Sequence, residues 1–247
     1  MVWVLCEVAD LPALWAARGL ERRGIGVEVV SAPLLAYALQ WEHRVGDDNA
    51  SFSIELSDGR RLCSSESVGV LNRLSAAPTA YLDAVGSPDR DYAVQELHAL
   101  FLSWLYALPG PVVNRPTPNG LSGRWRHPSE WVMLSAEAGL VAIPFRQSSE
   151  DPPDASMRWG WPAQGGELEP RVTVFVAGEH VVASAPGIPD AVLDGCRRLG
   201  RLAGETLLGV DLVPWDSGWA VAGGSAVPDL SLGGEPLLDV LREVLVR

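Results

Sequence analysis

The sequence contains no lysine: all 19 basic side chains are arginine, against 31 acidic ones, for a formal net charge of −12. The lack of lysine excludes mechanisms that need a lysine Schiff base, a lysine general base or a P-loop lysine. The shortage of positive charge argues against broad nucleic-acid binding, which depends on a basic surface that displaces counterions from phosphates. We therefore expect no nucleic-acid partner.

Cysteine and long apolar runs are also scarce. Cys6, Cys63 and Cys196 lie far apart and no Cys-x-x-Cys or cysteine–histidine cluster accompanies them, so neither a disulfide framework nor a zinc site is expected. No apolar run approaches the roughly 20 residues of a membrane helix. The apolar start, Met1–Cys6, is cut short by Glu7, which does not fit a signal peptide. These absences predict a soluble, cytoplasmic protein with no metal site and no membrane partner.

What is present is an ordinary globular composition, with 47% hydrophobic and 20% charged residues over 247 positions. This length fits one large domain or two small ones. Val2–Cys6 and Val27–Val30 are apolar runs typical of buried strands, and residues 11–23 between them have helical spacing. A strand, a helix and a strand within about 30 residues predict a βαβ unit and hence a small parallel sheet.

The rest of the chain predicts further strands and helices. Ser51–Leu56 and Arg61–Cys63 flank a turn and predict a hairpin. Residues 90–108 and 129–139 have helical patterns, the second with Ser129 as its expected N-cap. The carboxyl-terminal part predicts a hairpin (171–176 with 180–184), a helix (189–205), two strands (210–213 and 219–221) and a closing helix (235–246).

One loop, Asn119–His127, is dense in groups suited to phosphate. Gly120 and Gly123 allow backbone N–H groups to approach a ligand, and Arg124 and Arg126 are able to pair with an anion. The alternative is a polar loop whose arginines lie over neighbouring surface. The residues alone leave both interpretations open.

Several short motifs resemble the ATP-grasp superfamily, the ligases that join a carboxylate to an amine through an acyl phosphate. Arg171–Val176 followed by Gly178 is similar to the family's arginine-led hairpin, and Leu208–Leu212 is similar to its Gly-Val-Asp segment. Val113–Pro116 and Ala138–Pro144 are similar to its passage from an asparagine through a helix to Gly and Pro. The family's hairpin arginine faces the nucleotide phosphates.

This resemblance implies a nucleotide site, with Arg171 and Asp211 as its expected members together with Arg124 and Arg126 of the glycine-containing loop. The opening βαβ unit resembles the family's first subdomain. The implied fold class is α/β, with a small N-terminal parallel-sheet, pre-ATP-grasp-like unit followed by a truncated ATP-grasp-like α+β unit. The expected boundaries are residues 1–116, a connecting loop and helix at 117–146, a linker at 147–170 and the C-terminal unit at 171–247.

The sequence departs from the family at the magnesium ligands. The family holds magnesium on an acidic pair, the second within a Glu-x-Asn-x-x-Pro strand motif. If Pro228 is that proline, Gly223 replaces the glutamate and Ser225 replaces the asparagine. The family's phosphate-binding lysines are missing, and the segment after Phe145 is short for the central subdomain that covers the nucleotide. We therefore expect a degenerate member with no catalytic residue and no cofactor.

These features favour a non-catalytic ATP-grasp-like protein that binds a peptide or a companion enzyme in a biosynthetic or modification pathway. Among ten tryptophans, four lie in expected loops and are candidates for partner binding: Trp125, Trp159, Trp161 and Trp215. One alternative is a divergent carboxylate–amine ligase that uses ATP and magnesium. The other is a small-molecule binding module that uses a cleft between the two α/β units.

Overall fold

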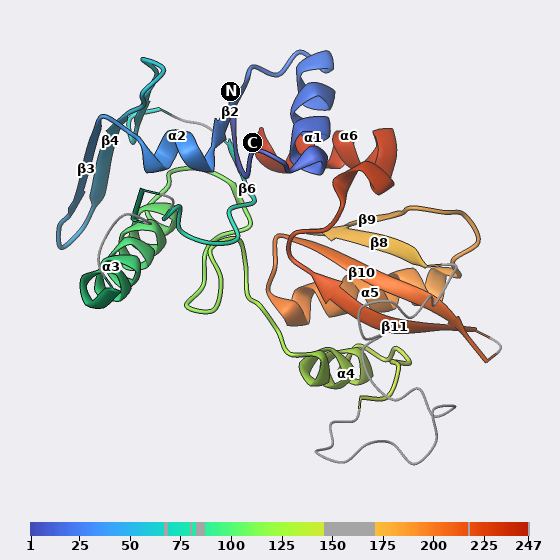
Figure 1. The fold of residues 1–247 in the computed structure, drawn as a ribbon. Helices are drawn as coiled ribbons and strands as arrows, with labels where there is room; N and C mark the ends of the chain where they lie inside the picture. Colours follow the sequence, from blue (N-terminus) through green and yellow to red (C-terminus); the bar gives the residue numbers. More distant parts are fainter. Residues whose placement is uncertain (67–68, 80, 83–86, 146–170, 217, 247) are drawn as a thin grey trace. The chain divides into compact units, whose positions relative to one another are not determined.

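The computed structural model describes residues 1–66, 69–79, 81–82, 87–145, 171–216 and 218–246 (Figure 1). These residues form two compact units. The first contains residues 1–124 together with 238–247, and the second contains residues 125–237. No helix of the described part is long and apolar enough to cross a membrane.

The first unit is built on a four-stranded parallel sheet of order β2-β1-β6-β7. In this sheet Val4 of β1 lies opposite Val29 of β2 and Leu71 of β6, and β1 is buried along its whole length. The predicted βαβ unit is therefore confirmed. The elements are β1 (Val2–Cys6), α1 (Leu11–Arg22), β2 (Val27–Ser31), β6 (Gly69–Asn72) and β7 (Val112–Val113).

A smaller antiparallel sheet of order β3-β4-β5 belongs to the same unit and contains the predicted hairpin. Its strands are β3 (Gln40–Val45), β4 (Ala50–Glu55) and β5 (Arg61–Cys63), and the neighbouring helices are α2 (Ala32–Ala36) and α3 (Ser87–Tyr106). Trp104 of α3 forms edge-to-face contacts with Trp41 and Phe52, at ring-centroid distances of 5.1 and 6.0 Å. Such aromatic contacts bury a large apolar area and join α3 to this sheet.

The closing helix α6 (Gly234–Leu245) packs beside α1 in the first unit (Figure 1). Gly19 of α1 has no side chain, which leaves room for Leu238: a Cβ at position 19 would lie 2.4 Å from a Leu238 methyl carbon. Arg23 adds an ion pair to Asp239 at 2.7 Å. No pattern in the sequence indicates that a helix at the end of the chain returns to the opening unit.

The second unit contains a four-stranded antiparallel sheet of order β11-β10-β8-β9. One face of this sheet packs against α5, where Gly200 allows Val176 to approach closely. The predicted C-terminal hairpin, helix, strands and closing helix are all present, so the α/β class is confirmed. The elements are α4 (Pro128–Glu137), β8 (Val172–Ala177), β9 (His180–Ala183), α5 (Asp190–Ala203), β10 (Leu207–Trp215), β11 (Gly218–Ser225) and the 3-10 helix η2 (Leu230–Gly233).

The start of α4 corrects one sequence prediction. His127, not Ser129, is the N-cap: its ring nitrogen Nδ1 accepts a hydrogen bond from the Ser129 backbone N–H at 3.3 Å. Glu130 completes a capping box by accepting from the His127 backbone N–H at 3.3 Å. Pro128 already has helical geometry at the first position, so Ser129 lies inside the helix and is not its boundary.

Candidate functional site

A polar row crosses the sheet of the second unit. Thr173 of β8 lies directly opposite Asp211 of β10, which in turn lies opposite Gly223 of β11. Residues that are directly opposite in an antiparallel sheet point to the same face. Beyond Thr173, the Ser184 backbone N–H donates to the Thr173 carbonyl at 2.9 Å. Ser184, Thr173, Asp211 and Gly223 therefore occupy one line across the sheet.

This row lies on the face that points away from α5. Val210 and Leu212, the neighbours of Asp211 in β10, belong to the apolar core that includes α5, and side chains alternate between the faces of a strand. Next to the row, Pro228 covers Gly209 so closely that a Cβ there would lie 2.5 Å from the proline ring. The polar row is thus a partly open strip beside a covered part of the sheet.

The two residues that the resemblance placed in a nucleotide site, Arg171 and Asp211, meet on this strip. Arg171 Nη1 lies 3.4 Å from Asp211 Oδ2, with 38% of the arginine side chain and 24% of the aspartate side chain exposed. Thr173 Oγ1 donates to the other carboxylate oxygen, Oδ1, at 2.9 Å. Both oxygens of Asp211 therefore already have partners within the protein.

Burial raises the pKa of Asp211 above its ordinary value of 3.8. The Thr173 hydroxyl and the Arg171 guanidinium favour the charged form and offset this effect only in part. Folding thus favours the neutral carboxyl, because desolvation penalises the charge. The resulting cost to stability appears as the pH rises through the folded-state pKa, and it vanishes below the ordinary pKa, where Asp211 is neutral in both states.

Replacing Asp211 with asparagine should therefore stabilise the protein at neutral pH. The new amide retains an oxygen for the Thr173 hydroxyl and removes the desolvated charge. We expect the free energy of unfolding to rise by about 1 kcal/mol near pH 7, which is within the usual range for a stabilising substitution. Urea unfolding near pH 7 and near pH 3 tests this, because the gain should disappear at the lower pH.

Asp58 provides a matched control, since hydrogen bonds from Arg60 lower the pKa of this exposed carboxyl. Asp58→Asn should give no stabilisation at neutral pH, because the charged form is the favoured one there. A gain of the same size for both variants, or a gain for Asp211→Asn that does not depend on pH, would contradict the account of Asp211.

The donor set around Asp211 does not fit a magnesium ion bridging triphosphate oxygens. Such an ion is held by one or two protein carboxylates together with phosphate oxygens and water. Here both oxygens of Asp211 are engaged by Arg171 and Thr173, and Gly223 brings no side chain to the position opposite Asp211. Ser225 is further along β11, and its hydroxyl accepts from the Val227 backbone N–H at 3.0 Å. Within the described ranges, no group of three or more His, Cys, Asp and Glu side chains is placed to hold a metal.

The two arginines of the loop have different surroundings. Arg126 is buried, its Nη1 donates to Glu205 Oε1 at 2.9 Å and its Nη2 donates to the Ala203 carbonyl. Its guanidinium carbon also lies 5.4 Å from the centre of the Trp131 ring. Arg124, by contrast, is exposed and is the last residue of the first unit's opening segment. A nucleotide role for either residue stays a prediction, and Arg126 has an evident role inside the second unit.

Of the four candidate tryptophans, Trp125 is the one with a large exposed surface among the described residues. Its side chain is 68% exposed and its ring lies 6.3 Å from that of His127. Trp215 is half-buried and packs against a small apolar cluster of the second unit. Trp159 and Trp161 lie outside the described residues. The Trp125 side chain is therefore exposed enough to contact a binding partner. Its role in partner binding stays a prediction.

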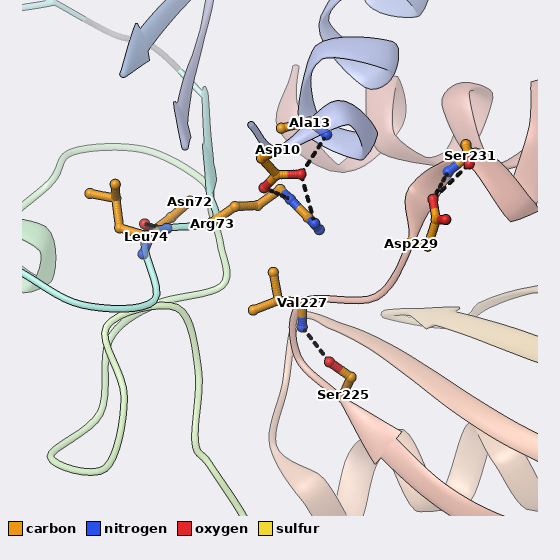
Figure 2. A network of polar contacts seen from close by, with 9 residues as sticks. All are labelled: Asp10, Ala13, Asn72, Arg73, Leu74, Ser225, Val227, Asp229 and Ser231. Atoms are coloured by element: carbon orange, nitrogen blue, oxygen red, sulfur yellow. Dashed lines mark hydrogen bonds and ion pairs between the residues drawn. The ribbon is translucent and has the colours of Figure 1, made fainter. Parts of the chain in front are cut away.

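Sequence reasoning missed a polar network in the first unit, at the carboxyl ends of β1 and β6 (Figure 2). Arg73 forms a two-pronged ion pair with Asp10, with Nε–Oδ2 and Nη2–Oδ1 distances of 2.7 and 3.1 Å. Asp10 also caps α1 by accepting from the Ala13 backbone N–H at 3.0 Å. The adjacent Asn72 donates to the Asn114 and Leu121 carbonyls at 3.0 and 2.7 Å. An aspartate just before Leu11-Pro12 is a helix-start signal that would have found the cap.

Comparisons with known proteins agree with this architecture. No protein-family model matches the sequence, and no curated protein matches it. Among solved structures, the macrocyclase MdnC bound with precursor peptide MdnA, from Microcystis aeruginosa, aligns with a TM-score of 0.72 and 11% identity over 100% of this chain and 99% of its own. A Chryseobacterium gregarium RiPP-associated ATP-grasp ligase in complex with ADP and a leader and core peptide gives a TM-score of 0.69 and 8% identity, over 98% and 96% of the two chains.

A third structure, the ATP-grasp ligase PsnB complexed with its minimal precursor, magnesium and ADP, gives a TM-score of 0.65 and 18% identity over 98% of this chain and 97% of that one. At such low identities the likeness concerns the fold alone. The protein therefore has an ATP-grasp-like fold, as its short motifs indicated. Because the alignments extend over nearly the full length of both chains, they argue against a strong truncation.

Proposed function

We propose that this protein is a peptide-binding, non-catalytic member of a peptide-modification pathway, with an ATP-grasp-like fold that does not itself join a carboxylate to an amine. The observation that carries the proposal is the set of neighbours that surround the Asp211 carboxylate. It faces Gly223 where a second carboxylate is needed, and its own oxygens are bound to Arg171 and Thr173.

The chemistry of phosphoryl transfer explains why this matters. Catalysis of that step depends almost entirely on positioning and on neutralising charge with metal ions, lysines and arginines. This chain has no lysine and a net charge of −12. The peptide half of the proposal is supported by the similar structures, a macrocyclase bound with a precursor peptide and two ATP-grasp ligases complexed with a leader and core peptide or with a minimal precursor. The exposed Trp125 also supports it.

A divergent ligase is the second candidate, favoured by one observation: Arg171 and Asp211 meet on a partly open strip of the sheet. For this function, carboxyl activation would consume ATP, and attack by an amine would release phosphate and form the amide. The two candidates differ in whether a bound peptide changes mass, because amide formation within a peptide removes the elements of one water molecule.

The test uses the full chain, purified with its peptide partner from the native host. We expect titration calorimetry with Mg-ATP to give no heat, and we expect the captured peptide to keep its mass after incubation with Mg-ATP. Recovery of no peptide would contradict the binding half of the proposal. Loss of one water mass would overturn the non-catalytic half and establish the ligase. Micromolar Mg-ATP binding that Arg171→Ala abolishes would contradict the expected absence of a nucleotide site.

A further inference from the structure

Helix α1 carries an apolar and basic stripe on its outward face. Leu11, Leu14, Trp15, Arg18 and Arg22 together line a surface hollow of about 280 Å³. Their spacing of three or four residues places them one above another along the helix. The opposite face, built from Ala13, Ala16, Ala17 and Leu20, is the one buried in the first unit.

An outward helix face of this composition is unusual, because a helix that buries one face normally presents charged and polar residues on the other. Leu11 is 71% exposed, and Leu14 and Trp15 are only half-buried. Tryptophan and arginine are also the residue types most enriched at the energetic centres of protein interfaces. The stripe thus has the composition of a binding surface.

The charge of the stripe is opposite to that of the whole chain. Arginines 18 and 22 line the hollow and no acidic residue does, although the protein carries 31 acidic and 19 basic side chains. Glu21, the one acidic residue of α1, is not among the lining residues. A partner that complements this surface therefore has carboxylates beside apolar side chains.

We propose that the α1 stripe binds an acidic peptide segment, with its apolar side chains on Leu11, Leu14 and Trp15 and its carboxylates paired with Arg18 and Arg22. This rests on the proposed function, which supplies a peptide partner, and it specifies where that partner binds and with what chemistry. The stripe extends about 16 Å along the helix axis. This length corresponds to about five residues of extended peptide.

The test is a fluorescence-anisotropy titration with a synthetic, fluorescein-labelled peptide of about ten residues, long enough to extend past the stripe. Its Asp and Glu residues alternate with Leu and Phe, and a second peptide carries Lys and Arg in place of the acids. We expect the wild-type protein to bind the acidic peptide and not the basic one, with an affinity that falls as salt is added. Arg18→Glu with Arg22→Glu should weaken binding at least about tenfold.

The chain provides a matched control in Arg197→Glu with Arg201→Glu. These two arginines have the same spacing on another helix, α5, and pair with exposed Asp194 and Glu179. The control variant changes the net charge by the same amount and should bind within about twofold of wild type. Arg18→Ala with Arg22→Ala is a milder second variant, expected to lose about threefold, and circular dichroism checks that every variant is folded. A change in tryptophan emission on binding should be absent in Trp15→Phe.

In the binding measurements on the purified protein, three results would overturn the proposal: no binding of the acidic peptide by wild type, equal weakening in the control pair, or binding of phosphatidylglycerol vesicles that requires Arg18 and Arg22. The last result would make the stripe a lipid-binding face. Native-host capture separates this proposal from the proposed function. If Arg18→Glu with Arg22→Glu still captures the peptide, α1 is not its site although peptide binding stands, whereas wild type that captures none contradicts the proposed function itself.

Discussion

Replacing Arg126 with methionine should lower the free energy of unfolding by about 3–5 kcal/mol, the usual cost of removing one partner of a buried ion pair. The side chains of Arg126 and Glu205 are only 6% and 5% exposed. Methionine matches the apolar stem of arginine and leaves the Glu205 carboxylate buried with its cation gone. The Ala203 carbonyl, which accepts from Arg126 Nη2, also loses a donor. Urea unfolding of the variant and the wild type measures the difference.

A double-mutant cycle distinguishes this cause from a general packing defect. Arg126→Met combined with Glu205→Leu removes both charges, and well-packed apolar residues are able to replace a buried ion pair at little cost. We expect the double variant to regain most of the lost stability. A deficit of about 1 kcal/mol should remain, because the Ala203 carbonyl still lacks its hydrogen-bond donor. If the two substitutions simply add, the charges are not coupled and the explanation fails.

The expected destabilisation of Arg126 variants determines which arginine is suitable for testing the predicted nucleotide site. The sequence makes Arg126 a candidate phosphate ligand, but a substitution there is expected to destabilise the second unit strongly whatever its role in binding. Loss of ligand binding in an Arg126 variant would therefore carry no information about contact with the ligand. Arg171 is the better position, because its side chain is 38% exposed and its ion pair with Asp211 is long, so its removal should cost little stability.

Local patterns predict the parts of the fold that depend on apolar spacing. The apolar runs that form β1 and β2 predict parallel strands because the helical segment between them has the length of a crossover. The motif comparison also places Gly223 at the position of the missing glutamate, and the register puts Gly223 directly opposite Asp211. In both cases the information lies within a short stretch of chain.

What the sequence could not predict depends on distant partners or on a weak local signal. Strand β3 reads Gln-Trp-Glu-His-Arg-Val and is mostly exposed or half-buried, so no buried alternation marks it. The ion pairs of Arg126 and Arg73 join residues 79 and 63 positions apart. A single sequence does not show which distant carboxylate an arginine will meet. Because Glu205 is not recognisable as the partner of Arg126 from the sequence, Arg126 is interpreted there as a residue available to an anionic ligand.

Replacing Asp10 with asparagine should produce the second large loss of stability, again about 3–5 kcal/mol. Asparagine is as good an N-cap as aspartate, so the hydrogen bond from the Ala13 backbone N–H is retained. What is removed is the negative charge that meets Arg73, whose side chain is 6% exposed. The expected loss therefore measures the buried guanidinium left without its carboxylate, not the start of α1. Urea unfolding measures it, and adding Arg73→Met should recover most of the stability.

Asp229→Asn is the matched control for this substitution (Figure 2). Asp229 also caps a helix, accepting from the Ser231 backbone N–H at 3.0 Å, but it is exposed. Asp229→Asn makes the same change of charge and retains the cap, so it should alter the free energy of unfolding by no more than about 0.5 kcal/mol. If Asp10→Asn were as mild as Asp229→Asn, burial of the Asp10–Arg73 pair would not govern its energetics. A large loss at position 10 alone would show that the carboxyl ends of β1 and β6 are held by charge rather than by the helix cap.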